Sequence, residues 1–203
     1  MTRTLTRATV LALAGASTFM LAAAAIQPDL PTGHPAVSSP KMAVEKSNAD
    51  PADVESIDAV LNTYYDSISG GIGEPRDWDR FLSLFSPDTQ FIVARTVNGE
   101  SVPLALTPQE FVDSNKTYFE KGGYFEKDIH RQINTYGNIA QVFSTYASRR
   151  TLEDPEPYSR GINSMQLMRT GDRWWITTIM WESERPDINP IPATYLPAPE
   201  TDG

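Results

Sequence analysis

The chain has 203 residues, of which 40% are hydrophobic and 10% aromatic, so it is long enough for one domain with its own core. Its formal net charge is −9 at neutral pH, and such acidity argues against binding to nucleic acid or anionic lipid, since both require a cationic surface. The chain contains no cysteine, which excludes disulfides and thiolate metal ligands.

The N-terminus has the pattern of a secretory signal peptide. Arg3 and Arg7 precede an apolar run, residues 8–25, that ends in four alanines. A basic start, a short apolar run and small residues at its end predict cleavage after Ala25, and therefore a periplasmic or secreted protein without stable membrane insertion. The competing interpretation, a retained membrane anchor, requires about 20 apolar residues, and small or polar residues interrupt this run.

Two proline-rich segments flank the predicted domain. Residues 26–50 lack apolar periodicity and are expected to form a flexible tether, in which His34 has no second metal ligand near it. Residues 186–203 are predicted to form an extended tail that straps across the domain surface, because their prolines exclude a helix or a central strand. The domain itself is expected to span residues 51–185.

The first predicted element is a helix capped by Asp50, with Pro51 at its first position and an apolar stripe that continues to Ile68. A second, short helix is expected to begin near Asp77 and to stop before Pro87. The stripe of the first helix consists of Val54, Ile57, Leu61, Tyr64, Tyr65 and Ile68.

A hairpin and a third helix are predicted next. The turn signal Asn98-Gly99 joins strands expected at residues 89–97 and 101–106. Thr107 and Glu110 then form a capping box that opens a helix, which ends at Gly122.

Four consecutive strands complete the domain, each rich in β-branched or aromatic residues and closed by turn residues. Strands joined by tight turns predict an antiparallel sheet with the helices packed on one side, which is an α+β architecture. The four runs are residues 124–137, 138–152, 159–171 and 172–185.

Several of these stretches together resemble the nuclear transport factor 2-like (NTF2-like) superfamily, which includes ketosteroid isomerase, scytalone dehydratase and the SnoaL-type polyketide cyclases. The resemblance covers residues 51–184 and rests on YYDSISGG, DWDRFLSLFSPDTQFIV, TPQEFV, IHRQINTYGNIAQVFSTY and GDRWWITTIMW. It implies that the sheet curves into a cone closed by about three helices around an apolar pocket; with the predicted signal peptide, the chain would be an exported member of the group. It also implies that the outer sheet face often forms a homodimer.

Two residues are weak candidates for acid/base catalysis. His130 titrates near neutrality by default, but strict alternation places it with Gln132 and Asn134 on the outer face unless a bulge reverses the strand. Glu182 falls on an apolar face with Asn163, where a buried carboxylate would act as a base with a raised pKa. The alternative for Glu182 is an exposed position at the strand end.

The last hairpin is expected to pair Met168 with Trp175, Gln166 with Thr177, Ser164 with Ile179 and Ile162 with Trp181. Both faces of this hairpin are largely apolar. The outer face is therefore predicted to form a homodimer or to be covered by the C-terminal tail.

Aromatic and amide side chains are the candidates for the pocket wall. The tyrosines would donate hydrogen bonds and the tryptophans would shape the pocket, although such residues are often simply core. No metal or cofactor is predicted, and neither the aspartate base of the isomerases nor the paired histidines of the dehydratase can be placed. The predicted pocket residues are Tyr64, Tyr65, Trp78, Tyr146, Asn163 and Trp181.

Two functions remain open from the sequence. The first is a module that binds a small hydrophobic molecule or a protein partner without clear catalytic machinery. The alternative is a cofactor-independent isomerase, cyclase or dehydratase that uses an acid/base residue in the cone pocket. An open cavity with His130 or Glu182 inside it would favour the enzyme.

Overall fold

The computed structural model of the chain describes residues 48–198. The predicted signal peptide lies outside the described residues, as do the tether up to residue 47, with His34, and residues 199–203 of the tail. Within the described part of the chain, no helix is long and apolar enough to cross a membrane.

The helices differ from the prediction at one point. The single helix expected over residues 51–68 is divided, because Ser56 has extended backbone angles (φ −139°, ψ 163°) and its Oγ accepts a hydrogen bond from Ala59 N at 3.0 Å. The capping box of Thr107 and Glu110 is confirmed. The helices are α1 Pro51–Val54, α2 Ile57–Ile68, α3 Trp78–Leu82 and α4 Pro108–Gly122.

The sheet contains the six predicted strands. They are β1 Phe85–Val97, β2 Glu100–Leu106, β3 Phe125–Tyr136, β4 Ile139–Arg149, β5 Ser159–Thr170 and β6 Arg173–Ser183. Their order is β2-β1-β6-β5-β4-β3, and the pairs are antiparallel except β1 with β6, which is parallel. The expectation of a wholly antiparallel sheet is therefore wrong at this one pair, which no tight turn connects. β1 also begins earlier than predicted, and Pro87 lies where its register with β6 shifts.

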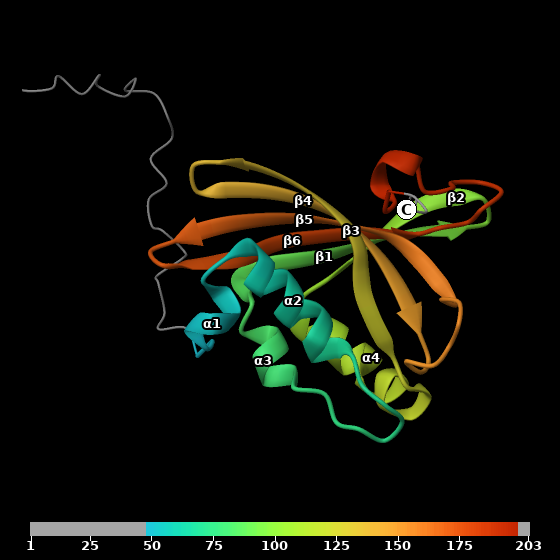
Figure 1. Cartoon of the computed structure of the whole chain (residues 1–203), viewed down its shortest axis with the longest axis horizontal. Coiled ribbons are helices and arrows are strands. Elements are labelled where there is room, and N and C mark those ends of the chain that lie inside the picture. The colour runs from blue at the N-terminus through green and yellow to red at the C-terminus, as the bar shows by residue number, and fades with distance from the viewer. Residues whose placement is uncertain (1–47, 199–203) are drawn as a thin grey trace, which may run out of the picture. The chain divides into compact units, whose positions relative to one another are not determined.

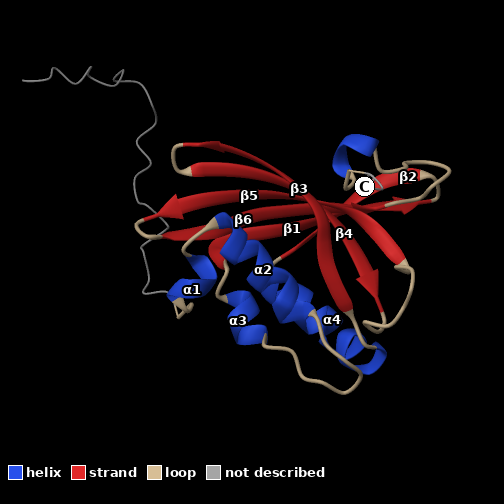
Figure 2. Ribbon diagram, in the orientation of Figure 1, coloured by secondary structure: helices blue, strands red, loops and turns tan. Residues whose placement is uncertain are grey.

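The helices and the tail lie on opposite faces of the sheet. Figures 1 and 2 show the sheet curving around α2, α3 and α4, with the C-terminal segment, red in Figure 1, on the other side. In this segment, the short 3-10 helix η1 Ala193–Tyr195 contacts β4: the Thr145 hydroxyl donates to the Tyr195 carbonyl oxygen (2.6 Å), and the Phe143 and Tyr195 rings are 5.4 Å apart. The α+β class with a curved sheet and helices on one face is thus confirmed.

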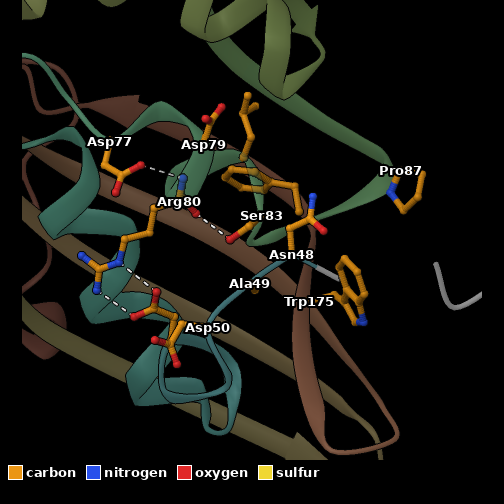
Figure 3. Close-up of a pocket in the computed structure, with 12 residues that line it drawn as sticks. Asn48, Ala49, Asp50, Asp77, Asp79, Arg80, Ser83, Pro87 and Trp175 are labelled. Atoms are coloured by element: carbon orange, nitrogen blue, oxygen red, sulfur yellow. Dashed lines mark hydrogen bonds and ion pairs between the residues drawn. The ribbon is translucent and has the colours of Figure 1, made fainter. Parts of the chain in front are cut away.

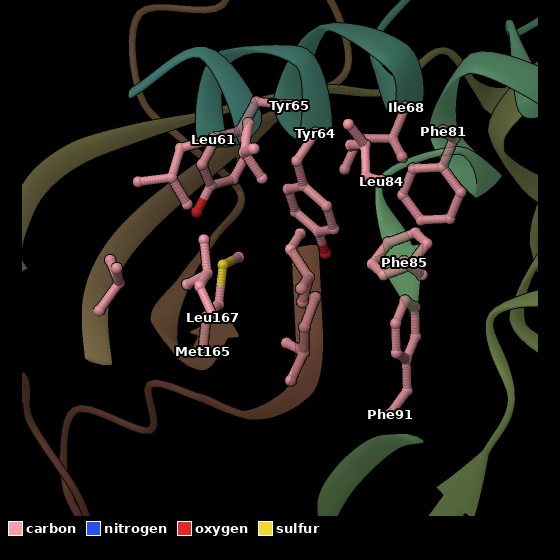
Figure 4. Close-up of a cluster of buried hydrophobic side chains, with 14 of the residues drawn as sticks. Leu61, Tyr64, Tyr65, Ile68, Phe81, Leu84, Phe85, Phe91, Met165 and Leu167 are labelled. Carbon is pink, nitrogen blue, oxygen red and sulfur yellow. The ribbon is translucent and has the colours of Figure 1, made fainter. Parts of the chain in front are cut away.

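The core fills the space between the helices and the inner face of the sheet, and aromatic rings dominate one end of it (Figure 4). Phe81 of α3 lies 4.9 Å from Phe85, which lies 5.0 Å from Phe91 of β1 (ring centroids, edge-to-face). Tyr64 of α2 joins this group at 5.6 Å from Phe81. These contacts fix α2 and α3 against β1, and so set the distance between helices and sheet.

Two bulges decide which side chains point inward. In β3, Asp128 pairs with Tyr146 and His130 pairs with Thr145, so Ile129 is an extra residue. In β6, Ile176 pairs with Leu167 and Thr178 pairs with Gln166, so Thr177 is extra. Beyond each bulge, even- and odd-numbered side chains exchange faces relative to the residues before the bulge.

The second bulge corrects the predicted register of the last hairpin. Met168 pairs with Trp175 as expected, but beyond Thr177 each partner is one residue later than predicted. Trp181 therefore pairs with Asn163 on the inner face. The observed pairs are Gln166 with Thr178, Ser164 with Met180 and Ile162 with Glu182.

Candidate functional site

A cavity of about 210 Å³ lies between the helices α2 and α4 and the inner face of the sheet, where β3, β4, β5 and β6 line it. We call it the inner cavity. Phe111 and Trp181 contribute apolar surface to the wall, whereas hydroxyl groups, two amides and one carboxyl group contribute polar surface. The polar residues of the wall are Tyr64, Asn115, Tyr118, Tyr124, Glu126, Tyr146, Ser148, Tyr158, Ser159, Asn163 and Ser183.

Among residues 48–198, Glu126 contributes the single carboxyl group of this wall, and the residue is 8% exposed. It lies on β3 before the bulge, opposite Ser148 of β4, whose hydroxyl donates to Glu126 Oε2 at 2.8 Å. Tyr124 also donates its hydroxyl to Oε2, and the Asn163 amide hydrogen-bonds to the same carboxyl group. The Ser69 hydroxyl contacts the Glu126 backbone at N (3.0 Å) and O (3.1 Å), which ties this strand to the end of α2.

Burial raises the pKa of the Glu126 carboxyl group above its ordinary value of 4.5, and the hydrogen bonds from Tyr124, Ser148 and Asn163 oppose this rise only in part. No Lys, Arg or His belongs to the wall of the inner cavity within residues 48–198. The carboxylate consequently has no cationic partner there, and neutral donors alone stabilise it. Such a group takes up a proton more readily than an exposed glutamate does.

The neighbouring polar groups are held in fixed positions. Asn163 Nδ2 donates to the Tyr65 hydroxyl at 3.1 Å, and that hydroxyl is 2.6 Å from the Ser144 hydroxyl. The Tyr146 hydroxyl lies 3.0 Å from that of Ser183, and burial raises the pKa of Tyr146 to about 12. Each of these groups stays neutral at physiological pH.

The Tyr64 hydroxyl group is a hydrogen-bond donor that the fold itself does not use. Burial raises its pKa well above 10, so that it remains a phenol, and its hydroxyl has no hydrogen bond to any of residues 48–198. It points from α2 toward the sheet (Figure 4). The inner cavity thus presents the Tyr64 hydroxyl group as a donor and the Glu126 carboxyl group, which can exchange a proton.

The six residues predicted for the pocket divide into two groups. Tyr64, Tyr146, Asn163 and Trp181 line the inner cavity. Tyr65 lies behind Asn163 and fixes its amide, whereas Trp78 packs on Phe119 at 6.0 Å and does not line the cavity.

The two residues predicted as acid/base candidates do not line the inner cavity. His130 follows the bulge at Ile129 and pairs with Thr145, whose side chain contacts the tail on the outer face. Glu182 follows the bulge at Thr177 and forms an ion pair with Arg185 at 2.5 Å, with its side chain 45% exposed. The structure therefore separates both residues from the buried polar groups.

Glu126 is not among the site residues predicted from the sequence. Strict alternation places residues 126 and 130 on the same face, because both numbers are even, and only the bulge at Ile129 separates them. The one local signal is Tyr124, which lies two residues earlier, immediately before β3, and hence on the same side as Glu126.

A larger hollow, of about 840 Å³, lies at the other end of the helices (Figure 3). Three of its acidic residues have structural roles. Asp50 and Asp77 cap α1 and α3, and Asp53 forms an ion pair with Arg80 at 2.7 Å. The Thr63 hydroxyl completes this pair by donating to Asp53 at 3.0 Å. Within residues 48–198, no group of three His, Asp or Glu side chains is arranged to hold a metal ion.

No protein-family model and no curated protein matches the sequence. Among solved structures, the chain is similar to a protein with a cystatin-like fold from Nostoc punctiforme, at 12% identity and a TM-score of 0.48, over 63% of this chain and 88% of that one. It is similar to an NTF2-like protein from Pseudomonas putida, at 9% identity and a TM-score of 0.48, over 62% and 82% of the two chains. It is also similar to an NTF2-like protein from Silicibacter pomeroyi, at 13% identity and a TM-score of 0.45, over 63% and 92%. All three are described as proteins of unknown function, and they give no residue of this chain a role.

Proposed function

We propose that the inner cavity binds a small, largely apolar molecule with a carbonyl group, and that Glu126 moves a proton on it without a cofactor. The observation that carries this proposal is Glu126 itself, a buried carboxyl group with a raised pKa and only neutral partners, in the wall of a cavity. Buried polar groups of this kind are rarely retained for stability, because each costs desolvation.

The chemistry follows from the groups present. The Glu126 carboxylate takes a proton from a carbon next to the carbonyl, and the electron pair of the C–H bond moves into an enolate. The Tyr64 hydroxyl donates to the oxygen on which the charge develops. In a substrate with a carbon–carbon double bond next to that carbon, the enolate is a dienolate, and return of the proton to its far carbon shifts the double bond and gives an isomer, so that no atom is gained or lost. A raised pKa suits Glu126 to both steps, since a base is most effective when its pKa lies near the working pH.

Deuterium exchange tests this function without knowledge of the substrate. Small cyclic and aromatic ketones are incubated in D₂O with the protein, and loss of the signal from the protons next to the carbonyl is followed by NMR. We expect exchange with at least one ketone, reduced about 100-fold or more by Glu126→Gln, because general base catalysis contributes about 10²–10⁴-fold. Exchange that persists at the wild-type rate in Glu126→Gln would refute the role of this residue.

Binding without chemistry is the second candidate function, and the outer face of the sheet provides the observation. Phe143 and Met180 line an apolar groove of about 460 Å³ between this face and the tail, and Met180 is 45% exposed. Homodimerisation through this face stays a prediction, which sedimentation equilibrium of wild type and Met180→Glu tests. Export to the periplasm or medium also stays a prediction, tested by N-terminal sequencing of the mature protein.

A further inference from the structure

Arg150 lies beside the inner cavity in an unusual setting. Its guanidinium carbon is 4.9 Å from the ring centre of Tyr118 and 4.3 Å from that of Tyr158, and both of these rings line the inner cavity. One of its Nη2 protons is donated to the Tyr118 hydroxyl, and Nη1 donates to the Gly123 carbonyl oxygen at 3.4 Å. We call Tyr118, Arg150 and Tyr158 the arginine cluster.

The backbone beneath this cluster is held in place. Asp154 Oδ2 accepts from Arg150 N at 2.9 Å and from Thr151 N at 3.1 Å, and Oδ1 accepts from the Thr151 hydroxyl at 2.9 Å. The Asp154 carboxylate is thereby engaged with the turn and not with the Arg150 side chain. The arginine is presented by a preformed turn, so a ligand would not have to order it.

The guanidinium of Arg150 has no carboxylate partner within residues 48–198, in contrast to those of Arg80, Arg131, Arg160 and Arg185. A guanidinium has five N–H donors, and the two hydrogen bonds described above use only two of them. A cation with free donors therefore lies beside a cavity whose own wall contains no cation. This arrangement suits a planar anion such as a carboxylate, which a guanidinium can bind through two parallel hydrogen bonds.

We propose that the arginine cluster binds the carboxylate of a small oxo acid whose carbonyl end lies in the inner cavity near Glu126. The proposal rests on the proposed function in that it uses the same cavity, and it names the substrate class as carboxylic acids with a ketone at the opposite end. Arg150 is the residue that determines specificity for the acid, whereas Glu126 acts on the carbonyl end.

A matched pair of probes tests this assignment on the full chain. The probes are a cyclohexanone carboxylate, with ketone and carboxylate at opposite ends of the ring, and its methyl ester. Calorimetric titration gives their dissociation constants with wild type, Arg150→Gln, Arg149→Gln and Glu126→Gln. Arg149 is the control, because it is the neighbouring arginine and donates to the Asp154 carbonyl oxygen at 3.1 Å.

We expect wild type and Arg149→Gln to bind the acid about tenfold or more tightly than the ester. Arg150→Gln should bind both probes with the affinity that wild type has for the ester, which also shows that the variant is folded. The proposal is overturned if the acid is not preferred by wild type, if Arg150→Gln retains the preference, or if neither probe binds. Glu126→Gln should keep the preference for the acid. The two proposals can therefore fail separately: deuterium exchange that is as fast in Glu126→Gln as in wild type refutes proton transfer by Glu126, whereas a missing preference for the acid refutes the role of Arg150.

Discussion

Replacing Glu126 with glutamine should change how the stability of the protein depends on pH. Glutamine has nearly the same shape and can still accept hydrogen bonds from Tyr124 and Ser148, but it does not ionise. In wild type, burial raises the pKa of Glu126 above 4.5, so the folded state holds this proton more tightly than the unfolded state. Stability linked to the protonated carboxyl group is therefore fully present below pH 4.5 and is lost as the pH rises to the raised pKa.

The size of this effect follows from the linkage between the pKa and the free energy of unfolding. Each unit by which the pKa of Glu126 exceeds its unfolded value removes about 1.4 kcal/mol of stability at higher pH. For a domain of this length, about 1 kcal/mol corresponds to roughly 2–4 °C in melting temperature. Asp53 does not affect this comparison. Its pKa is lowered below 3.8, so its contribution to the free energy of unfolding is constant over the pH range above that value.

The assay is urea unfolding of wild type and Glu126→Gln at a series of pH values from about 4.5 to about 9, below the range in which the tyrosines ionise. We expect the free energy of unfolding of wild type to fall relative to that of the variant as the pH rises, and then to reach a constant difference. A difference that stays the same at every pH would show that Glu126 has an ordinary pKa, and would refute the proposed base.

Three further changes test contacts that hold the fold together, each by urea unfolding. Asp53→Asn should destabilise the protein by about 1–2 kcal/mol at neutral pH, because it weakens the ion pair with the partly exposed Arg80, and no loss would show that the pair contributes nothing. Arg76→Met should cost about 3 kcal/mol or more, because the Arg76 guanidinium donates to carbonyl oxygens at the end of α2, in the loop after it and in α4. A cost under about 1 kcal/mol would contradict this role. Gly161→Ala should destabilise by about 1–3 kcal/mol, because its Cβ would lie 2.4 Å from the Tyr146 hydroxyl, and a stable variant with an unmoved tyrosine would contradict the tight packing.

Local signals in the sequence were sufficient for most of the elements. The capping box at Thr107 starts α4, and the turns at Gly137 and Gly171 have positive φ angles (56° and 63°), as their glycines indicate. The parallel pairing of β1 with β6 was not predictable in this way, because it joins distant segments without a connecting turn.

The candidate site was predicted only in part, and the two bulges explain why. Strict alternation predicts which residues of a strand share a face, but the prediction fails across the bulges at Ile129 in β3 and Thr177 in β6. Beyond Thr177, Trp181 turns inward and Glu182 turns outward. Helix positions such as Tyr64 were easier to assign to the inner side, because the apolar stripe is regular throughout α2.

The position of the binding site is the central claim, and ligand binding by variant proteins tests it most directly. Thermal unfolding of wild type, Tyr64→Phe, Glu126→Gln, His130→Gln and Glu182→Gln is measured with and without small ketones and oxo acids. A compound at a hundred times its dissociation constant should stabilise wild type by about 2.7 kcal/mol.

We expect this stabilisation to be retained in the variants of His130 and Glu182, and to be reduced in those of Tyr64 and Glu126, because only the last two side chains line the inner cavity. The opposite pattern, with loss of binding at His130 or Glu182 and none at Tyr64 or Glu126, would place the site on the outer face and contradict the account.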